Sequence, residues 1–316
     1  MLNIKRKLLV GTVAMSLLGG MYAVQAIETD TINEKWGKPT VVYGGGLSDD
    51  KINETAKLFA ITNRENVHVQ VATGEDLINY LGSGDGDSSS MISSVMVQKR
   101  NKGQGVSVKI LTPQNITLIT PEQYSNAAIT AGVSDVDIEV ASVSKVTGES
   151  ALTGVYKAFA ANGEKLDEHR TAVAQQELET TNTIAQANEG VKGFSSEKLD
   201  QAMIDIKKEL AELKQKTGQL ATKDDIEKII MEALKRHSLD SVINQNQINQ
   251  IINFAVNYQQ TDAINSTEVL NQLSKLSDTV TQKVSNLVDQ AQKEGWFDKI
   301  VQFFQDVFQS ITKLFQ

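Results

Sequence analysis

The sequence predicts an α+β (or α/β) domain followed by an all-helical region, and three observations support this fold class. Over residues 27–162, short β-branched runs alternate with short helical stretches. After residue 163 these runs give way to apolar positions spaced by three and four, which is helical spacing. With 40% hydrophobic and 22% charged residues in 316, the composition is that of a globular chain with room for one or two cores.

Composition also excludes several classes of function. The chain has no cysteine, so thiolate nucleophiles, cysteine metal sites and disulfides are excluded, and its 3 histidines argue against a multi-histidine metal centre. A net charge of −8 argues against a nucleic-acid partner, because phosphate binding needs clustered cations. We expect no cofactor.

Residues 1–26 resemble a secretory signal peptide. Lys5, Arg6 and Lys7 precede a long apolar run, and Val24 and Ala26 place small residues at positions −3 and −1 of a cleavage site. An uncleaved membrane anchor is the alternative, because the apolar run approaches the length of a bilayer span. We expect cleavage after Ala26 and a secreted, cell-envelope-associated protein of a bacterium that avoids disulfides.

The mixed α/β domain is expected over residues 27–162. The predicted strands are 40–43, 67–71, 91–99, 106–111, 116–119 and 136–143, and the predicted helices are 49–61, 74–81, 121–131 and one that begins near Ser150. Ser48 and Thr120 are the expected N-caps, and Pro121 suits a first helical position. A Gly-rich connection over 100–105 predicts that strands 91–99 and 106–111 form a hairpin.

The helical region, residues 163–294, contains two heptad-like seams. The first seam consists of Leu199, Met203, Ile206, Leu210, Leu213, Thr217 and Leu220; the second consists of Val269, Leu273, Leu276, Val280, Val284, Leu287 and Ala291. Gly218 and Gly295 keep both seams short. An antiparallel hairpin or bundle is therefore favoured over a long dimeric coiled coil.

Residues 295–316 predict an amphipathic C-terminal helix, and this segment holds five of the 9 phenylalanines. Its expected membrane or partner face is Trp296, Phe297, Ile300, Phe304, Phe308, Ile311 and Phe315. This face could lie in a lipid interface, or it could pack on the protein, a second copy or a partner. The polar face is not enriched in cations, which slightly favours packing.

One loop is a candidate anion or ligand site. Thr147, Gly148, Glu149, Ser150 and Gly154 join a strand to a helix through small and hydroxyl residues, and a Gly-rich turn that opens a helix presents free N–H groups. The lysine of a phosphate-binding loop is missing. A tight junction that allows close packing is the alternative interpretation.

A catalytic role would rest on carboxylates. Asp137 and Glu139 share one face of their expected strand, and a hydrolase could use such a pair together with Glu149. More often such a pair is the solvated face of a strand. We therefore predict no catalytic residue and no metal ligand.

Several segments together resemble the YpuA-like family of secreted Gram-positive proteins, which carries a domain of unknown function. The resemblance is carried by Val41-Val42-Tyr43-Gly44, Leu47-Ser48, Ile92-Ser93-Ser94, Asn126-Ala127-Ala128-Ile129-Thr130-Ala131-Gly132-Val133 and residues 148–154. It implies export and a cell-envelope setting, and it implies no catalytic residues.

The sequence therefore predicts a non-catalytic binding protein outside the membrane. Its expected partner is an unknown protein or a cell-envelope component, with a membrane surface and self-association as further alternatives for the C-terminal helices. A cell-wall hydrolase or transferase that uses surface carboxylates is the alternative function.

Overall fold

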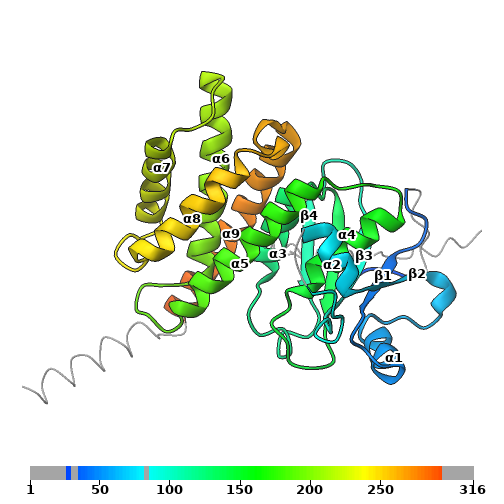
Figure 1. The fold of residues 1–316 in the computed structure, drawn as a ribbon. Helices are drawn as coiled ribbons and strands as arrows, with labels where there is room; N and C mark the ends of the chain where they lie inside the picture. The colour runs from blue at the N-terminus through cyan, green and yellow to red at the C-terminus, as the bar shows by residue number, and fades with distance from the viewer. Residues whose placement is uncertain (1–25, 30–34, 82–84, 294–316) are drawn as a thin grey trace, which may run out of the picture.

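The computed structural model describes residues 26–29, 35–81 and 85–293, and Figure 1 shows a sheet with helices at one end of the molecule and a group of helices at the other. The strands are β1 (Thr40–Gly44), β2 (His68–Ala72), β3 (Ser94–Lys99), β4 (Val106–Ile110) and β5 (Val136–Ala141). The helices that follow or separate them are α1 (Asp49–Leu58), α2 (Gly74–Leu81), α3 (Pro121–Ala131) and α4 (Ser150–Ala161). The last five are α5 (Glu168–Ala187), α6 (Ser196–Thr217), α7 (Lys223–Arg236), α8 (Gln245–Tyr258) and α9 (Thr267–Lys293).

The five strands form one mixed sheet in the order β2-β1-β3-β5-β4. The two inner pairs are antiparallel, whereas β2 and β4, at the two edges, each run parallel to their single neighbour. The predicted hairpin is wrong, because β5 lies between β3 and β4. The strand of Val136, Ile138 and Val140 is the more completely buried one and takes the inner position, and α3 is the crossover that a parallel β4–β5 pair requires.

The two faces of the sheet carry separate apolar cores. Val42, Val95 and Ile138 point to the face that α3 and α4 cover, in a core that includes both helices. Tyr43 and Met96 point to the opposite face, where they pack with α1 residues and with Ile27. A sheet covered on both faces explains why β1 and the first four residues of β3 are buried without a break.

The helix signals of the sequence behave as expected except at Ser48, which occupies the N-cap position of α1 without a side-chain capping hydrogen bond. Thr120 caps α3 in a capping box with Gln123, and Pro121 occupies the first turn. The helix ends at Gly132, whose φ of 95° is left-handed. Thr222 caps α7 in the same way.

The region beyond residue 163 is helical, as predicted, and α5–α9 pack with one another and with α3 around one apolar core. The seam residues Leu199, Met203 and Ile206 of α6 are buried in it, and so are Leu273 and other seam residues of α9. The two seams thus contact each other within one chain. None of the helices among the described residues combines the length and apolar character that crossing a bilayer requires.

A buried ion pair links the helical region to the sheet domain. The Lys207 ammonium on α6 lies 2.7 Å from the Glu177 carboxylate on α5, and both side chains are almost fully buried. Lys207 also donates to the Thr130 hydroxyl and to the Asn126 carbonyl of α3, and Thr130 donates to Glu177. Because three helices meet in this network, it fixes the helical region against α3.

Candidate functional site

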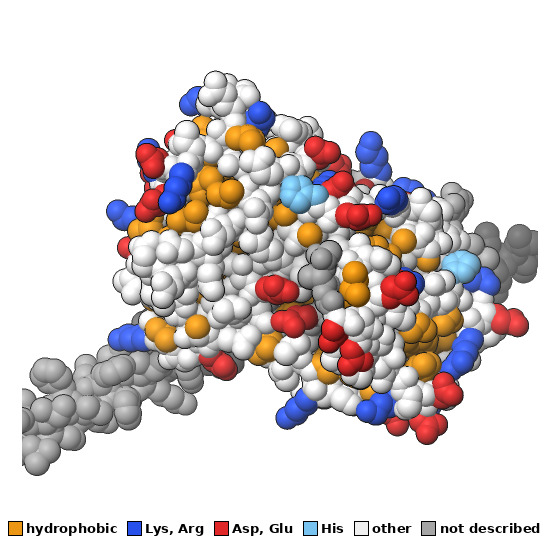
Figure 2. All heavy atoms as spheres, in the orientation of Figure 1, with side chains coloured by type: hydrophobic (Ala, Val, Ile, Leu, Met, Phe, Trp, Pro, Cys, Tyr) orange, Lys and Arg blue, Asp and Glu red, His pale blue; other side chains and the backbone are white. Residues whose placement is uncertain are grey.

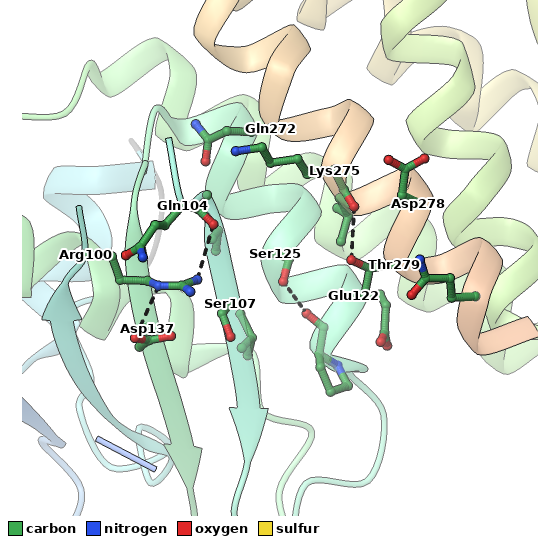
Figure 3. Close-up of a pocket in the computed structure, with 16 residues that line it drawn as sticks. Arg100, Gln104, Ser107, Glu122, Ser125, Asp137, Gln272, Lys275, Asp278 and Thr279 are labelled. Atoms are coloured by element: carbon green, nitrogen blue, oxygen red, sulfur yellow. Dashed lines mark hydrogen bonds and ion pairs between the residues drawn. The ribbon is translucent and has the colours of Figure 1, made fainter. Parts of the chain in front are cut away.

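A cavity lies along the outer edge of β4, where the sheet meets α3 and the middle of α9 (Figure 3). Its volume of about 600 Å³ is in the usual range for ligand sites. We call it the β4 cleft. It is lined by Arg100, Gln104, Gly105, Val106, Ser107, Val108, Pro121, Glu122, Ser125, Asp137, Gln272, Lys275, Leu276, Asp278, Thr279 and Gln282.

Backbone groups of β4 face the cleft. Val136 donates its N–H to the Gly105 carbonyl, and Leu111 donates to the Val140 carbonyl, so the odd-numbered residues of this strand are turned toward β5. By the alternation of a parallel ladder, the N–H and C=O groups of Val106 and Val108 are turned away from β5, into the cleft. Among the described residues, no hydrogen bond satisfies these groups. The cleft therefore presents unpaired strand-forming groups.

The sheet side of the cleft carries a charged pair. Arg100 at the end of β3 lies 3.4 Å from the Asp137 carboxylate of β5 and donates to the Gln104 carbonyl at 3.3 Å. Burial raises the pKa of Asp137, and the Arg100 charge and a hydrogen bond from Ser107 oppose this rise. This pair offers both a cation and an acceptor to a ligand.

The helical side of the cleft is also polar and mixed in charge. Figure 3 shows Gln272, Lys275 and Thr279 of α9 across the cavity from the sheet residues. Lys275 donates to the carbonyl of Gly103, and Lys283 lies 3.0 Å from the Glu122 carboxylate of α3. Both walls therefore present charges of each sign.

One buried polar atom of the cleft wall has no hydrogen-bond partner among the residues that the structure describes. Gln272 is only 4% exposed, and its Nε2 donates to the Val133 carbonyl at 3.5 Å. Its Oε1 is buried and accepts no hydrogen bond from the residues described. A buried unsatisfied acceptor is costly, and a donor on a ligand would satisfy it.

A second carboxylate lies behind the wall. Asp200 of α6 is fully buried and accepts a hydrogen bond from the Thr120 hydroxyl at 3.2 Å. Burial raises its pKa well above the usual value, and the nearby charge of Glu122 raises it further. Because Asp200 does not line the cleft, it acts on the stability of the α3 start rather than on a ligand.

The loop that the sequence predicts as an anion site makes hydrogen bonds to neighbouring parts of the protein. The Gly148 carbonyl accepts from the Tyr124 hydroxyl at 2.5 Å, and the Ser150 and Ser93 hydroxyls lie 2.6 Å apart. A Cβ on Gly154 would lie 2.9 Å from a Val95 methyl group, so this glycine permits close packing of α4 on the sheet. The Glu149 carboxylate also accepts from Asn182.

The three candidate carboxylates have different surroundings. Asp137 lines the cleft, Glu149 lies at the start of α4, and Glu139 is only 4% exposed and accepts from the N–H of Ile27 at 3.3 Å. Glu139 is therefore not on a solvated strand face, because the N-terminal segment covers it. Burial raises its pKa, and the Ile27 N–H and Lys109 oppose the rise.

The predicted membrane or partner face, from Trp296 to Phe315, lies outside the described residues. Within the described part of the chain, the acidic and histidine side chains form no cluster of three or more that could hold a metal ion. The β4 cleft is the site that the sequence did not indicate, because only the strand order places β4 at an edge.

Comparison with known proteins gives two findings. A family model described as a protein of unknown function (DUF1002) matches residues 43–276, which cover most of the chain and both of its regions. The "Uncharacterized protein YpuA" of Bacillus subtilis (strain 168) is 28% identical over 284 residues, which is 89% of this chain and 90% of that protein. No solved structure matches the chain.

Proposed function

Because the chain belongs to the DUF1002 family, whose description is a protein of unknown function, we propose a function from its own cleft. It is a non-catalytic binding protein of the cell envelope, exported by its signal peptide. It binds a short extended peptide segment, which adds as a strand to the free edge of β4. The unpaired backbone groups of Val106 and Val108 inside the cleft are the observation that carries this proposal.

The chemistry of the cleft supports a polar peptide of mixed charge. Strand addition provides main-chain hydrogen bonds, which any peptide can make, and the walls provide selectivity. Arg100 and Lys275 suit a carboxylate, Glu122 and Asp278 suit an amine, and the buried Gln272 oxygen suits an N–H donor. None of the described residues that line the cleft is aromatic, which disfavours a ligand that stacks.

Binding is favoured over the hydrolase or transferase alternative by the positions of the carboxylates. Of Asp137, Glu139 and Glu149, only Asp137 is among the described residues that line the cleft. Asp137 is paired with Arg100. Of the other two acids in the lining, Glu122 is paired with Lys283 and Asp278 is exposed. A paired-carboxylate mechanism needs two acids that face each other across the scissile bond without such cations between them and the substrate.

The test is a titration of the mature chain with hexapeptides. Each peptide has one glutamate at one end, one lysine at the other, and alternating serine and valine in between. We expect the backbone amide signals of Val106 and Val108 to shift in NMR spectra. Val108→Pro removes one outward N–H and leaves the ladder to β5 intact, so binding should weaken about 10-fold or more.

The matched control is Val69→Pro on the opposite edge of the sheet. The N–H of His68 is turned toward β1, so Val69 is also an outward residue. This variant should bind the peptides like the unchanged chain. Equal losses in both variants, or peptide-induced shifts that cluster on β2, would contradict binding at β4.

The C-terminal segment, residues 295–316, adds a second binding element to this proposal. Its apolar face, which includes Trp296 and Phe304, suits attachment to a partner, a second copy or a membrane surface. Deleting the segment should abolish co-sedimentation with anionic liposomes if it binds membranes. If the full chain does not sediment, a protein partner or self-association is the favoured role.

A further inference from the structure

The N-terminal segment occupies a buried site on the sheet. The Ile27 side chain is 7% exposed and packs with Tyr43 and Met96 in the core beside α1. Its backbone nitrogen donates to the Glu139 carboxylate at 3.3 Å. Ala26, one residue earlier, is exposed. Glu28, the next residue, is exposed again, so it is the Ile27 side chain that is inserted into the protein interior.

Ala26 and Ile27 flank the cleavage site that the sequence predicts. Hydrolysis of the Ala26–Ile27 amide bond by the host's signal-peptide protease consumes one water molecule. It leaves a carboxylate on the released Ala26 and an amino group on Ile27, which is largely protonated at neutral pH because an α-amino group has a pKa of about 8. The hydrogen bond of an uncharged amide thus becomes a contact between opposite charges.

We infer that export processing completes the fold: the new Ile27 ammonium group forms a buried ion pair with Glu139, for which the structure already holds the carboxylate and a pocket for the isoleucine side chain. The inference rests on the export that is part of the proposed function. It does not depend on peptide binding at β4.

The surroundings of Glu139 fit this role. Burial raises the pKa of this carboxyl group, so an additional cation would hold it in the ionised form. The other charged groups that act on it are Lys109, which is its register partner on β4, and Asp137 on its own strand. Lys109 lowers its pKa and Asp137 raises it. The Ile27 ammonium would lie closer to the carboxylate than an exposed N-terminus could.

The experiment compares three full-length mature chains that differ only at the N-terminus. One begins at Ile27 with a free amine, one begins at Ile27 with an acetylated amine, and one begins at Ala26. Near pH 6.5 we expect the free-amine Ile27 chain to have a folding equilibrium constant about 10-fold larger than the other two, by urea denaturation. This advantage should be lost as pH rises through the pKa of the amine, because the amine then loses its charge.

The Glu139→Gln variant tests whether Glu139 is the partner of the Ile27 ammonium group. In this background the three chains should be equally stable, because the amide carries no charge for the ammonium to pair with. Equal stability of the three chains with Glu139 present would overturn the inference, and no substitution is needed for that comparison. N-terminal sequencing of the protein secreted by a Gram-positive host should read Ile27 first. A different first residue would also overturn the inference and would leave the β4 binding proposal standing.

Discussion

The two edges of the sheet have the same construction and different surroundings. Both β2 and β4 run parallel to one neighbour, and both turn the backbone groups of two valines away from the sheet. At β2 these residues, Val69 and Val71, are 46% and 40% exposed. At β4 the corresponding Val106 and Val108 lie in a cleft walled by α3 and α9. Figure 2 shows hydrophobic side chains gathered at the end of the molecule where Figure 1 places α1 and β2.

This difference is the basis for proposing a peptide site at β4 and not at β2. An open edge such as β2 can pair with any extended chain, whereas an edge inside a polar cleft selects by charge and by length. The helical region supplies the second wall of the cleft. On the proposed function, the specificity of the β4 edge therefore depends on how firmly α3 and α9 are held beside it.

The largest effect should come from breaking the buried ion pair that holds the helical region against α3. Lys207→Ala leaves the Glu177 carboxylate buried without its cation, which should lower the free energy of unfolding by about 3–5 kcal/mol and weaken peptide binding. Urea denaturation followed by circular dichroism measures the first effect. Lys216→Ala, at the exposed end of the same helix, should change it by less than about 0.5 kcal/mol. Similar losses of unfolding free energy in both variants would mean that the buried Lys207–Glu177 pair does not hold the helical region against α3.

A pH-dependent effect on stability should come from Asp200, which supports the start of α3 beside the β4 cleft. Native Asp200 keeps its proton to a higher pH than in the unfolded chain, so the free energy of unfolding should fall as pH rises above about 4 toward its raised pKa. Asp200→Asn should reduce this slope, because the amide does not ionise. Urea midpoints between pH 4 and pH 8 measure it. Asp278→Asn, an exposed acid of the cleft rim, is the control, and an equal change of slope there would contradict the assignment.

The smallest effect on stability should come from the open edge. Val71→Lys places a charge on an exposed position, so the free energy of unfolding should change by less than about 0.5 kcal/mol, while self-association at high concentration should fall. Light scattering and thermal denaturation measure the two quantities. Val108→Lys, on the covered edge, should be destabilising by about 2 kcal/mol or more, because its side chain is buried. Equal effects at the two positions would remove the distinction between the edges.

The sequence predicted the class of each region because local signals determine it. The N-cap at Thr120, the proline at position 121 and the spacing of Leu199, Met203 and Ile206 are local and correct. Strand order is not a local property: the turn signal at 100–105 indicated a hairpin, and the position of β5 depends on its fully buried face.

The candidate site was not predictable for the same reason. The β4 cleft combines residues from β3–β5, α3 and α9, and no motif in the sequence links them. Glu139 is a second example of what local sequence signals leave open. Its alternation with Ile138 and Val140 correctly placed it on the opposite face of the strand, but the expectation that this face is solvated was wrong at Glu139, because Ile27 covers it.

Helix α3 has a consequence for how the chain acquires its structure. Its residues from Glu122 to Ala131 are all buried, and its neighbours include α5, α6 and α9, the last about 150 residues later in the chain. The environment of α3 is therefore incomplete until α9 has been synthesised. Contacts of such large sequence separation form late, so the folding of the first half of the chain depends on a helix near the end of the described residues.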